Sequence, residues 1–427
     1  MKTEAERLAA YRQLRLEIRG SDTYLIVGID VAKDTHHAFI GTPTGKTLNK
    51  QLRFANNREG FELLTSRVET LRLQQHLEQV VYGLEPTANY HKPLAEYLVS
   101  HGLSVVQVAG TAVKQNRELL DGRWDKHDRK DAANVADLIA QGKCQFYDYP
   151  ELKVRELREL LSIKYKLKKQ EHGLKTRIRN NLLAKYFPEM DQFINSCKQD
   201  TYAIIGSCCA PEQIASLDFE QFFEQIVRVR RGQRQADHLY QIWQSAKDSI
   251  GCQTDETCGF EGHLLIEQLQ QTGQHIHELE QRIEQLCLTF DEYPYLLSIP
   301  GIGPDISSRI LAYIGDPYRF DNAHQVIKLA GLDLNASRSG RPALKATPVI
   351  SKRGQADLRY GLVQAACVAS TSNAYFSQWF AKKLNGRERE NGIGMILRVK
   401  LAAKMLIIAW TMMKNKEMFA YKKLINC

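Results

Sequence analysis

The run Tyr24-Leu25-Ile26-Val27-Gly28-Ile29-Asp30 is the stretch of sequence that decides the fold. It is apolar, rich in β-branched residues and ends in a carboxylate, which predicts a buried strand. Turn residues at 33–35 and 42–45 separate it from two further expected strands, at 37–40 and 46–54. Three strands joined by short turns predict an antiparallel meander.

Residues 60–141 continue with helical and extended patterns in alternation. The expected elements are helix 60–73, strand 79–84, helix 91–101, strand 104–108, helix 111–120 and helix 128–141. Strands that alternate with helices after a meander predict an α/β domain with a mixed sheet. A short amphipathic helix at 3–19 is expected to be a leader outside that core.

Four carboxylates occupy notable places in this pattern. Asp30 ends the first strand and Glu85 follows the fourth, and ligands gather at the ends of central strands. Asp128 and Asp131 lie three residues apart on a helix, so they project from one face. They are turned inward if the helix buries its apolar stripe of Ala132, Val135 and Ile139. Asp125 lies three residues before Asp128, so spacing alone leaves the choice of pair open.

These acids predict a metal site, because carboxylates that share one cleft raise each other's pKa unless a cation compensates them. Hard oxygen ligands suit Mg²⁺ or Mn²⁺. Two such ions about 4 Å apart would flank a phosphodiester and stabilise its attacking and leaving oxygens. The alternative for each acid taken singly is a helix cap or a solvated side chain.

Composition bounds the class of protein. A length of 427 residues favours two or three domains, and 43% hydrophobic with 25% charged residues is ordinary globular composition. The net charge of +9 is uneven, since basic blocks at 151–187 and 291–427 flank an acidic block at 188–290. Basic blocks favour a polyanionic partner such as nucleic acid. Solvated helix faces are the alternative.

Cysteine and hydropathy patterns indicate a cytoplasmic protein. The nine cysteines form no C-x-x-C pair, which is typical of reduced thiols. A zinc site from Cys252, Cys258 and His263 is an alternative to free thiols at these positions. The N-terminus lacks a signal-peptide core, and Lys and Arg interrupt the apolar run at 395–413. Neither export nor a membrane span is therefore expected.

The middle of the chain is predicted to be helical. Residues 151–186 form a basic helix with an apolar face, whose cations, including Lys168 and Lys169, either contact phosphate or are solvated. A heptad-like seam at 269–290 predicts a coiled coil or helical hairpin, within one chain or between two. The stretch 188–262 contains no motif from which a chemical function can be predicted.

A Pro-Gly-Ile-Gly-Pro stretch at 300–304, before a helix at 305–315, has the form of a helix-hairpin-helix. Gly301 and Gly303 would let backbone N–H groups approach phosphate oxygens at a helix N-terminus. Such contacts bind the nucleic-acid backbone without reading its sequence. An ordinary Pro-Gly loop is the alternative.

The segment 335–341 contains Ser339 and Gly340, with Arg338 and Arg341 on either side. An exposed serine beside guanidinium groups is a candidate nucleophile for a phosphate ester. Further cations follow that could contact nucleic acid, namely Lys352, Arg353 and Arg359. From the residues alone, a basic surface loop is the interpretation that the segment favours.

Three motifs give a family resemblance: Gly28-Ile29-Asp30, Leu84-Glu85-Pro86-Thr87 and Asp128-Arg129-Lys130-Asp131-Ala132. In this order they resemble the DEDD transposases of insertion elements, which are related to the Piv-type DNA invertases. The resemblance implies a RuvC-like, ribonuclease-H-type domain, and selects Asp30, Glu85, Asp128 and Asp131 as metal ligands, with Asp125 a bystander. Ala88 stands where that family usually has glycine, and His127 where it often has Thr or Ser.

The C-terminal motifs Pro-Gly-Ile-Gly, Ala-Gly-Leu, Ser-Gly and Ser-Lys-Arg-Gly extend the same resemblance. It implies that Ser339, rather than Ser337, is a recombinase nucleophile. The implied architecture is a leader at 1–22, a RuvC-like domain at 23–150, a basic and coiled-coil region at 151–290 and a helical C-terminal transposase domain at 291–427.

The implied activity is metal-dependent DNA cleavage and rejoining through a phosphoserine, with donor and target DNA as substrates. A structured bridge RNA as guide, a homo-oligomeric dimer or tetramer, and association with a prokaryotic nucleoid follow from the resemblance. A junction-resolving nuclease that uses water, or a non-catalytic nucleic-acid scaffold, are the alternatives.

Overall fold

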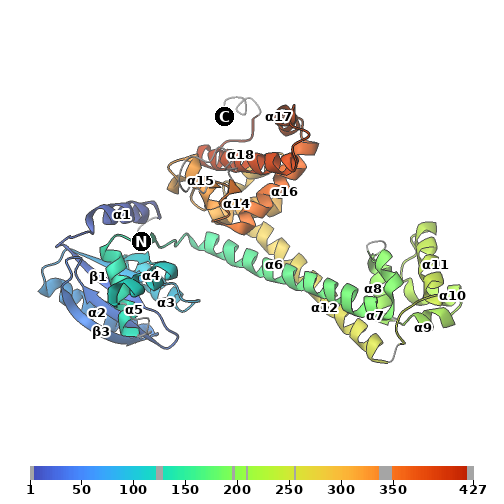
Figure 1. Ribbon diagram of the computed structural model, residues 1–427, viewed down its shortest axis with the longest axis horizontal. Helices are drawn as coiled ribbons and strands as arrows, with labels where there is room; N and C mark the ends of the chain where they lie inside the picture. The colour runs from blue at the N-terminus through green and yellow to red at the C-terminus, as the bar shows by residue number, and fades with distance from the viewer. Residues whose placement is uncertain are drawn as a thin grey trace. The chain divides into compact units, whose positions relative to one another are not determined.

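The structure is a computed structural model that describes residues 4–121, 128–194, 198–207, 210–253, 256–335 and 349–420. The chain divides into two compact units (Figure 1). Unit 1 comprises Met1–Glu151 with Asp316–Asn322, and unit 2 comprises Leu152–Gly315 with Ala323–Cys427.

Unit 1 is built on a six-stranded sheet with the order β3-β2-β1-β4-β5-β6. The strands are β1 (Tyr24–Asp30), β2 (Thr35–Gly41), β3 (Thr47–Ala55), β4 (Gln79–Leu84), β5 (Ser104–Gln107) and β6 (Gln145–Phe146). β1 to β3 pair antiparallel, and β1, β4 and β5 pair parallel. The expected meander and mixed sheet are confirmed, and the edge strand β6 is an addition.

Helices cover both faces of this sheet (Figure 1). They are α1 (Glu4–Glu17), α2 (Arg58–Gln74), α3 (His91–Ser100), α4 (Gly110–Asp121) and α5 (Asp128–Ala140). Leu25, Val27 and Ile29 of β1 pack in one core with α2 and α3. Tyr24 and Ile26 pack in the other core with α5, because successive side chains of a strand point to opposite faces.

Helix α1 belongs to the core of unit 1, so the expected leader outside the core is wrong. Leu14 and Ile18 are buried, in the same cluster as Tyr24. Polar contacts fix the helix as well, since the Tyr11 hydroxyl donates to the Cys144 backbone oxygen at 2.7 Å. The apolar side of a short amphipathic helix is enough to bury it against the sheet.

Unit 2 is mainly helical. Its N-terminal part contains α6 (Leu152–Arg177), the π-helix η1 (Ile178–Leu183), α7 (Ala184–Tyr186), η2 (Pro188–Gln192), α8 (Lys198–Ser207), α9 (Pro211–Ser216), α10 (Phe219–Ile226), α11 (Gln233–Lys247) and α12 (Glu256–Cys287). The long helices α6 and α12 lie side by side (Figure 1). Buried seam residues Ile276 and Leu279 belong to α12, so the heptad-like pattern has a partner helix within the chain.

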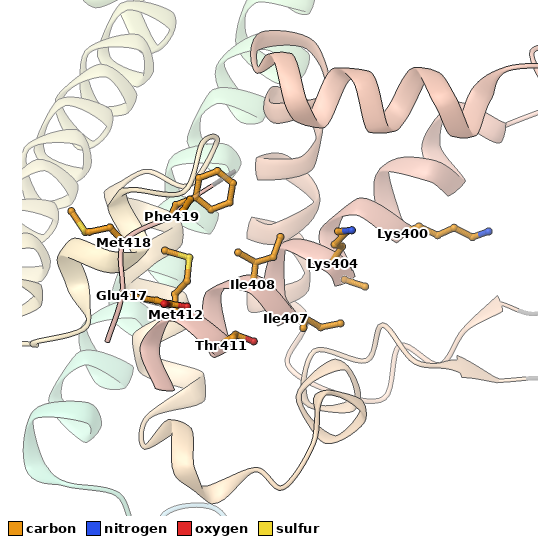
Figure 2. A pocket seen from close by; sticks show the side chains of 11 residues that line it. Lys400, Lys404, Ile407, Ile408, Thr411, Met412, Glu417, Met418 and Phe419 are labelled. Carbon is orange, nitrogen blue, oxygen red and sulfur yellow. The ribbon is translucent and has the colours of Figure 1, made fainter. Parts of the chain in front are cut away.

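The C-terminal part of unit 2 packs further helices and a two-stranded sheet. These are α13 (Tyr293–Leu297), α14 (Pro304–Ile314), α15 (Ala323–Leu329), β7 (Leu334–Asn335), β8 (Val349–Ile350), α16 (Ala356–Ser372), α17 (Ala374–Leu384) and α18 (Ile393–Asn415). An apolar cavity of about 350 Å³ is lined by α18 and by the segment that carries Met418 and Phe419. Figure 2 shows the side chains that line it. None of the helices in the described ranges has the length and the apolar character needed to cross a membrane.

Candidate functional site

Strand register places Asp30 and Glu85 side by side. β1 and β4 are parallel neighbours, and the last aligned pair is Ile29 with Leu84. The next positions along the two strands are therefore Asp30 and Glu85, about 5 Å apart at Cα, the spacing of adjacent strands. Leu84 packs in the core with α2 and α3, so Glu85 faces the side that α5 covers, as Asp30 does.

Two glycines let α5 lie directly on this face. A Cβ on Gly28 would lie 2.2 Å from the Ala132 backbone oxygen and 2.5 Å from the Ala136 nitrogen. A Cβ on Gly83 would lie 2.0 Å from Cδ1 of Ile139. Gly28 is two residues before Asp30, so the beginning of α5 lies near the carboxylate end of β1.

The Glu85 carboxylate lies at the beginning of α4. A Cβ on Gly110, the first residue of that helix, would be only 2.6 Å from Oε1 of Glu85. The N-terminus of a helix carries partial positive charge, which favours a carboxylate there. Glycine at 110 thus lets the Glu85 carboxylate lie directly against the beginning of the helix, and a Cβ there would require that carboxylate to shift.

Asp131 lies in the first turn of α5 and is only 3% exposed. Asp128 is the first residue of the same helix. Its side chain, like the whole of Asp125, lies outside the described residues, so the structure leaves the choice between them untested. Oxygen ligands from two strand ends and one helix start are the donor set that suits a hard divalent cation.

Within the described ranges, no group of three or more His, Cys, Asp or Glu side chains is placed to hold a metal ion. All three residues of the zinc alternative fall in those ranges, and Cys258 is buried while Cys252 is exposed. The zinc alternative of Cys252, Cys258 and His263 is therefore not assembled in the structure. The same finding covers Asp30, Glu85 and Asp131, whose described side chains do not form such a group by themselves.

A buried polar network joins α4 to α5. Nδ2 of Asn116 donates to Oδ1 of Asn134 at 2.6 Å and to Oδ2 of Asp137 at 2.8 Å. Nδ2 of Asn134 donates to the Val113 backbone oxygen at 2.7 Å. Buried polar groups that satisfy each other fix one arrangement of the helices that carry them. The network therefore sets α5 relative to the helix beside Glu85.

His37 is a candidate site residue that the sequence did not single out. It lies directly opposite Asp30 in the antiparallel pair of β1 and β2. Opposed side chains in such a pair share one face with Cβ atoms about 5 Å apart. Among the described residues, its buried Nδ1 atom has no hydrogen-bond partner. In the sequence His37 is an ordinary residue of a predicted strand. Only the strand register shows that it lies beside Asp30.

The loop after Glu85 is left-handed at Ala88, with a φ of +46°. Glycine adopts this conformation at little cost, whereas alanine is strained there. The departure from glycine noted in the sequence therefore falls on a position where the backbone favours glycine.

The Pro-Gly-Ile-Gly-Pro stretch connects α13 to α14. Gly301 has a φ of +87°, and a Cβ there would lie 2.9 Å from the Ala369 Cβ atom, so this glycine packs against α16. Gly303 has open space around it. Gly301 thus serves packing, and Gly303 remains the position at which a phosphate could approach the backbone.

Strands β7 and β8 flank the serine segment in the sequence. These strands pair antiparallel, with Asn335 opposite Val349, so the chain leaves and returns at one place. Ser339, Ser337, Arg338 and Arg341 lie outside the described residues. Among the following cations, Lys352 and Arg353 are exposed. Arg359 donates from Nη1 to the Ala330 backbone oxygen at 2.9 Å, which holds the Ala-Gly-Leu motif.

Two family models match the chain. One for DEDD transposases of the IS110 type, described as "Transposase", matches residues 27–188 and includes the four carboxylates. The other, described as "Transposase IS116/IS110/IS902 family", matches residues 293–381 and includes Ser339. The chain belongs to this transposase family. Transposases and DNA invertases act on DNA, which is in keeping with the basic blocks of this member.

Full-length relatives agree with the family models. The transposase is 24% identical over 407 residues to the insertion element IS116 uncharacterized 44.8 kDa protein of Streptomyces clavuligerus, covering 92% of this chain and 95% of that protein. It is 25% identical over 402 residues to the pilin gene-inverting protein of Moraxella bovis, covering 93% of this chain and 98% of that protein. Both likenesses therefore span units 1 and 2.

The basic helix of the transposase uses some of its cations internally. Lys164 of α6 contacts Glu280 at 2.9 Å and Asp305 at 2.7 Å. Burial opposes the charge of Lys164, but the two carboxylates raise its pKa overall. Lys168 is exposed and lies 3.5 Å from Glu171, and Lys169 is exposed. The outer side of α6 thus keeps cations at the surface.

Proposed function

We propose that this chain is a DNA transposase in which Asp30, Glu85, Asp128 and Asp131 hold Mg²⁺ or Mn²⁺ beside the scissile phosphate. The observation that carries the proposal is the strand register, which aligns Asp30 with position 85 on the face that α5 covers. Bound there, such ions would neutralise charge on the attacking and leaving oxygens.

Unit 1 is, on this proposal, a RuvC-like domain of the ribonuclease-H type. An antiparallel β1–β2–β3 meander next to the parallel strands β4 and β5 supports that assignment. The acids then lie at the ends of the central strands, where ligands of such sheets gather.

Ser339 is the proposed nucleophile. Its Oγ forms a bond to phosphorus while the bond from phosphorus to the leaving sugar oxygen breaks, and that oxygen takes up the serine proton. The phosphoserine keeps the phosphoester, so a sugar hydroxyl can later attack it, release the serine and rejoin the strand. Arg338 and Arg341 flank the serine in sequence and would neutralise the phosphate.

The cations outside this centre are proposed to hold nucleic acid. Gly303 offers its backbone to a phosphate, and the exposed side chains of Lys352, Arg353, Lys168 and Lys169 are placed at the surface. Gly301 packs against α16, and Arg359 donates a hydrogen bond to the Ala330 backbone oxygen, so both would stabilise the backbone near these contacts. The proposed partners are donor and target DNA, a structured guide RNA, and further copies of the chain in a dimer or tetramer on the nucleoid.

A plasmid that carries the intact element with its flanking sequences tests the serine mechanism. Excised junctions are counted by PCR in cells that express the parent, Ser339→Ala or Ser337→Ala. The expected result is loss of junctions with Ser339→Ala and near-parental levels with Ser337→Ala. Junctions at the parental level with Ser339→Ala would overturn the serine mechanism and favour a water-dependent nuclease.

The carboxylates are tested in the same cells with Asp131→Asn, which keeps the size of the side chain and removes its charge. We expect cleavage and junction formation to be lost, because the metal ions would lose a charged ligand. Unchanged cleavage would contradict the metal centre. It would favour the alternatives, in which the acids are caps or solvated side chains and the chain is a non-catalytic nucleic-acid scaffold.

The guide is tested by purifying the parental protein from its host and sequencing the bound nucleic acid. A discrete RNA encoded beside the coding region is the expected result. Random RNA and DNA fragments would contradict guidance by an element-encoded RNA, without bearing on the metal centre.

A further inference from the structure

A polar groove of about 640 Å³ lies in unit 2, where α6 passes into η1. One wall is a row of hydrogen-bonding side chains from these two helices, namely His172, Lys175, Thr176, Arg179 and Asn180. Asp191, Ile194 and Tyr202 also line the groove, the last of them from α8. The groove therefore combines cationic side chains with apolar and aromatic ones.

Helical spacing explains the row of donors. His172, Thr176 and Arg179 follow one another at intervals of four and three residues, so they share one face of the helix. Leu174 and Ile178 are buried against the helical core of unit 2, which turns that face outward. The helix then widens into the π-helix η1, a rare geometry that is frequent at functional sites.

Arg179 is held in the groove by Asp191. Its Nε contacts Oδ1 of the carboxylate, and its Nη2 lies 2.8 Å from Oδ2. A guanidinium has five N–H groups, so this pair leaves donors for an anion. Lys175 lies on the same wall, and its Nζ is 2.6 Å from Glu171. Both cations are half-exposed, so a ligand can reach them.

Tyr202 gives the groove a surface for a planar group. Its ring is partly buried against the helical core of unit 2 and also lines the groove with Ile194. Bases of single strands stack on such rings, whereas bases of a duplex are occupied by stacking on each other. The phosphates and bases of one strand thus match the cationic and the aromatic side chains of the groove.

We propose that this groove binds a single-stranded polynucleotide, with phosphates at Lys175 and Arg179 and a base at Tyr202. The proposal rests on the proposed function only for the class of partner, nucleic acid. Its chemistry is shared by RNA and DNA single strands, between which the experiment distinguishes.

The test measures the binding of full-length protein to a fluorescein-labelled single-stranded RNA, the same sequence as single-stranded DNA, and a duplex DNA. The variant Lys175→Gln/Arg179→Gln removes both groove cations. Arg177→Gln is the control for the single variants Lys175→Gln and Arg179→Gln, since it also removes one positive charge, but from a guanidinium that is not among the groove residues and pairs with Glu261 of α12 at 2.8 Å.

The expected result is about tenfold or more weaker single-strand binding by the double variant, and a salt slope reduced by about 1.4 for two lost phosphate contacts. Arg177→Gln should stay within about twofold of the parent, and RNA and DNA arms show which single strand is preferred. Losses in the single variants equal to that in the control would overturn the proposal, as would a loss confined to duplex DNA.

Photocrosslinking of 4-thiouridine RNA to the parental protein keeps the proposal testable if the double variant fails to fold. Crosslinked peptides that contain Tyr202 or residues 172–180 are expected. Crosslinks found only elsewhere would contradict the groove. Junction formation in cells is a separate readout, so a failure of the groove and a failure of the metal centre are distinguishable.

Discussion

The Asn116 side chain donates a hydrogen bond of 2.6 Å to Asn134, and both residues are buried between α4 and α5. One of these helices begins against Glu85 and the other begins at Asp128. The hydrogen bond therefore holds α4, which begins beside Glu85, against α5, which carries Asp128 and Asp131. Neither asparagine is itself a proposed metal ligand.

The variant Asn134→Ala should destabilise unit 1 by about 1–3 kcal/mol, because it leaves the buried donors and acceptors of its partners unsatisfied. Urea unfolding measures the loss, and a double-mutant cycle with Asn116→Ala should show strong coupling between the two sites. Additive effects of the two substitutions would contradict the network. Ser66→Ala, at an exposed position of α2, is the control and should change little.

The variant Gly28→Ala should displace α5, since the new methyl would meet the Ala132 and Ala136 backbone at 2.2 and 2.5 Å. A clash with backbone is not relieved by a rotamer change, so we expect a loss of about 3 kcal/mol or more. Thermal unfolding and junction formation in cells measure the effect. Gly173→Ala, at an open helical position of α6, should be neutral or stabilising. Unaltered stability and activity of Gly28→Ala would contradict the close packing of α5.

The strand pattern of unit 1 was predictable because the signals are local. Residues 24–30 and 79–84 are short apolar runs between turn residues, and both strands have the predicted bounds. Strand β6 was missed because two residues at a sheet edge have no periodicity to read. The burial of helix α1 was not predicted because it depends on a partner distant in the sequence, the face of the sheet that carries Tyr24.

The variant Ala88→Gly should stabilise unit 1 by about 1 kcal/mol, because position 88 has a φ of +46° that glycine adopts without strain. The midpoint of thermal unfolding should therefore rise. Ala381→Gly, in the exposed part of helix α17, should lower stability by a similar amount. A fall in stability with Ala88→Gly would contradict the left-handed loop.

Acid should destabilise unit 1 through His36. Burial lowers its pKa below the ordinary 6.5, and its Nδ1 accepts a hydrogen bond from the Ala32 N–H at 3.2 Å. Below about pH 6.5 the unfolded chain therefore binds a proton at His36 more readily than the folded chain does. The free energy of unfolding falls as the pH decreases through this range. Unfolding free energies measured from about pH 7.5 to about pH 5.5 should decline less in His36→Leu than in the parent. The exposed His324→Gln should keep the parental decline, and a decline in His36→Leu equal to the parental one would contradict this role.

The candidate site was predictable only in part. The sequence pattern predicted that Asp30 and Glu85 lie at the ends of strands and that the apolar stripe of α5 turns Asp131 inward. The strand register and the burial of Asp131 agree with these positions. The neighbour His37 and the coupling pair Asn116 and Asn134 were not predictable, because register and helix docking bring them together across the chain.

The central claim, a metal centre formed by Asp30, Glu85, Asp128 and Asp131, is tested most directly by titrating the purified protein with Mn²⁺ and measuring free Mn²⁺ by electron paramagnetic resonance. We predict saturable binding by the parent, loss of that binding in Asp30→Asn, and parental binding in Asp34→Asn, an exposed acid in the turn that follows β1. Equal Mn²⁺ binding by the parent and Asp30→Asn would contradict the centre.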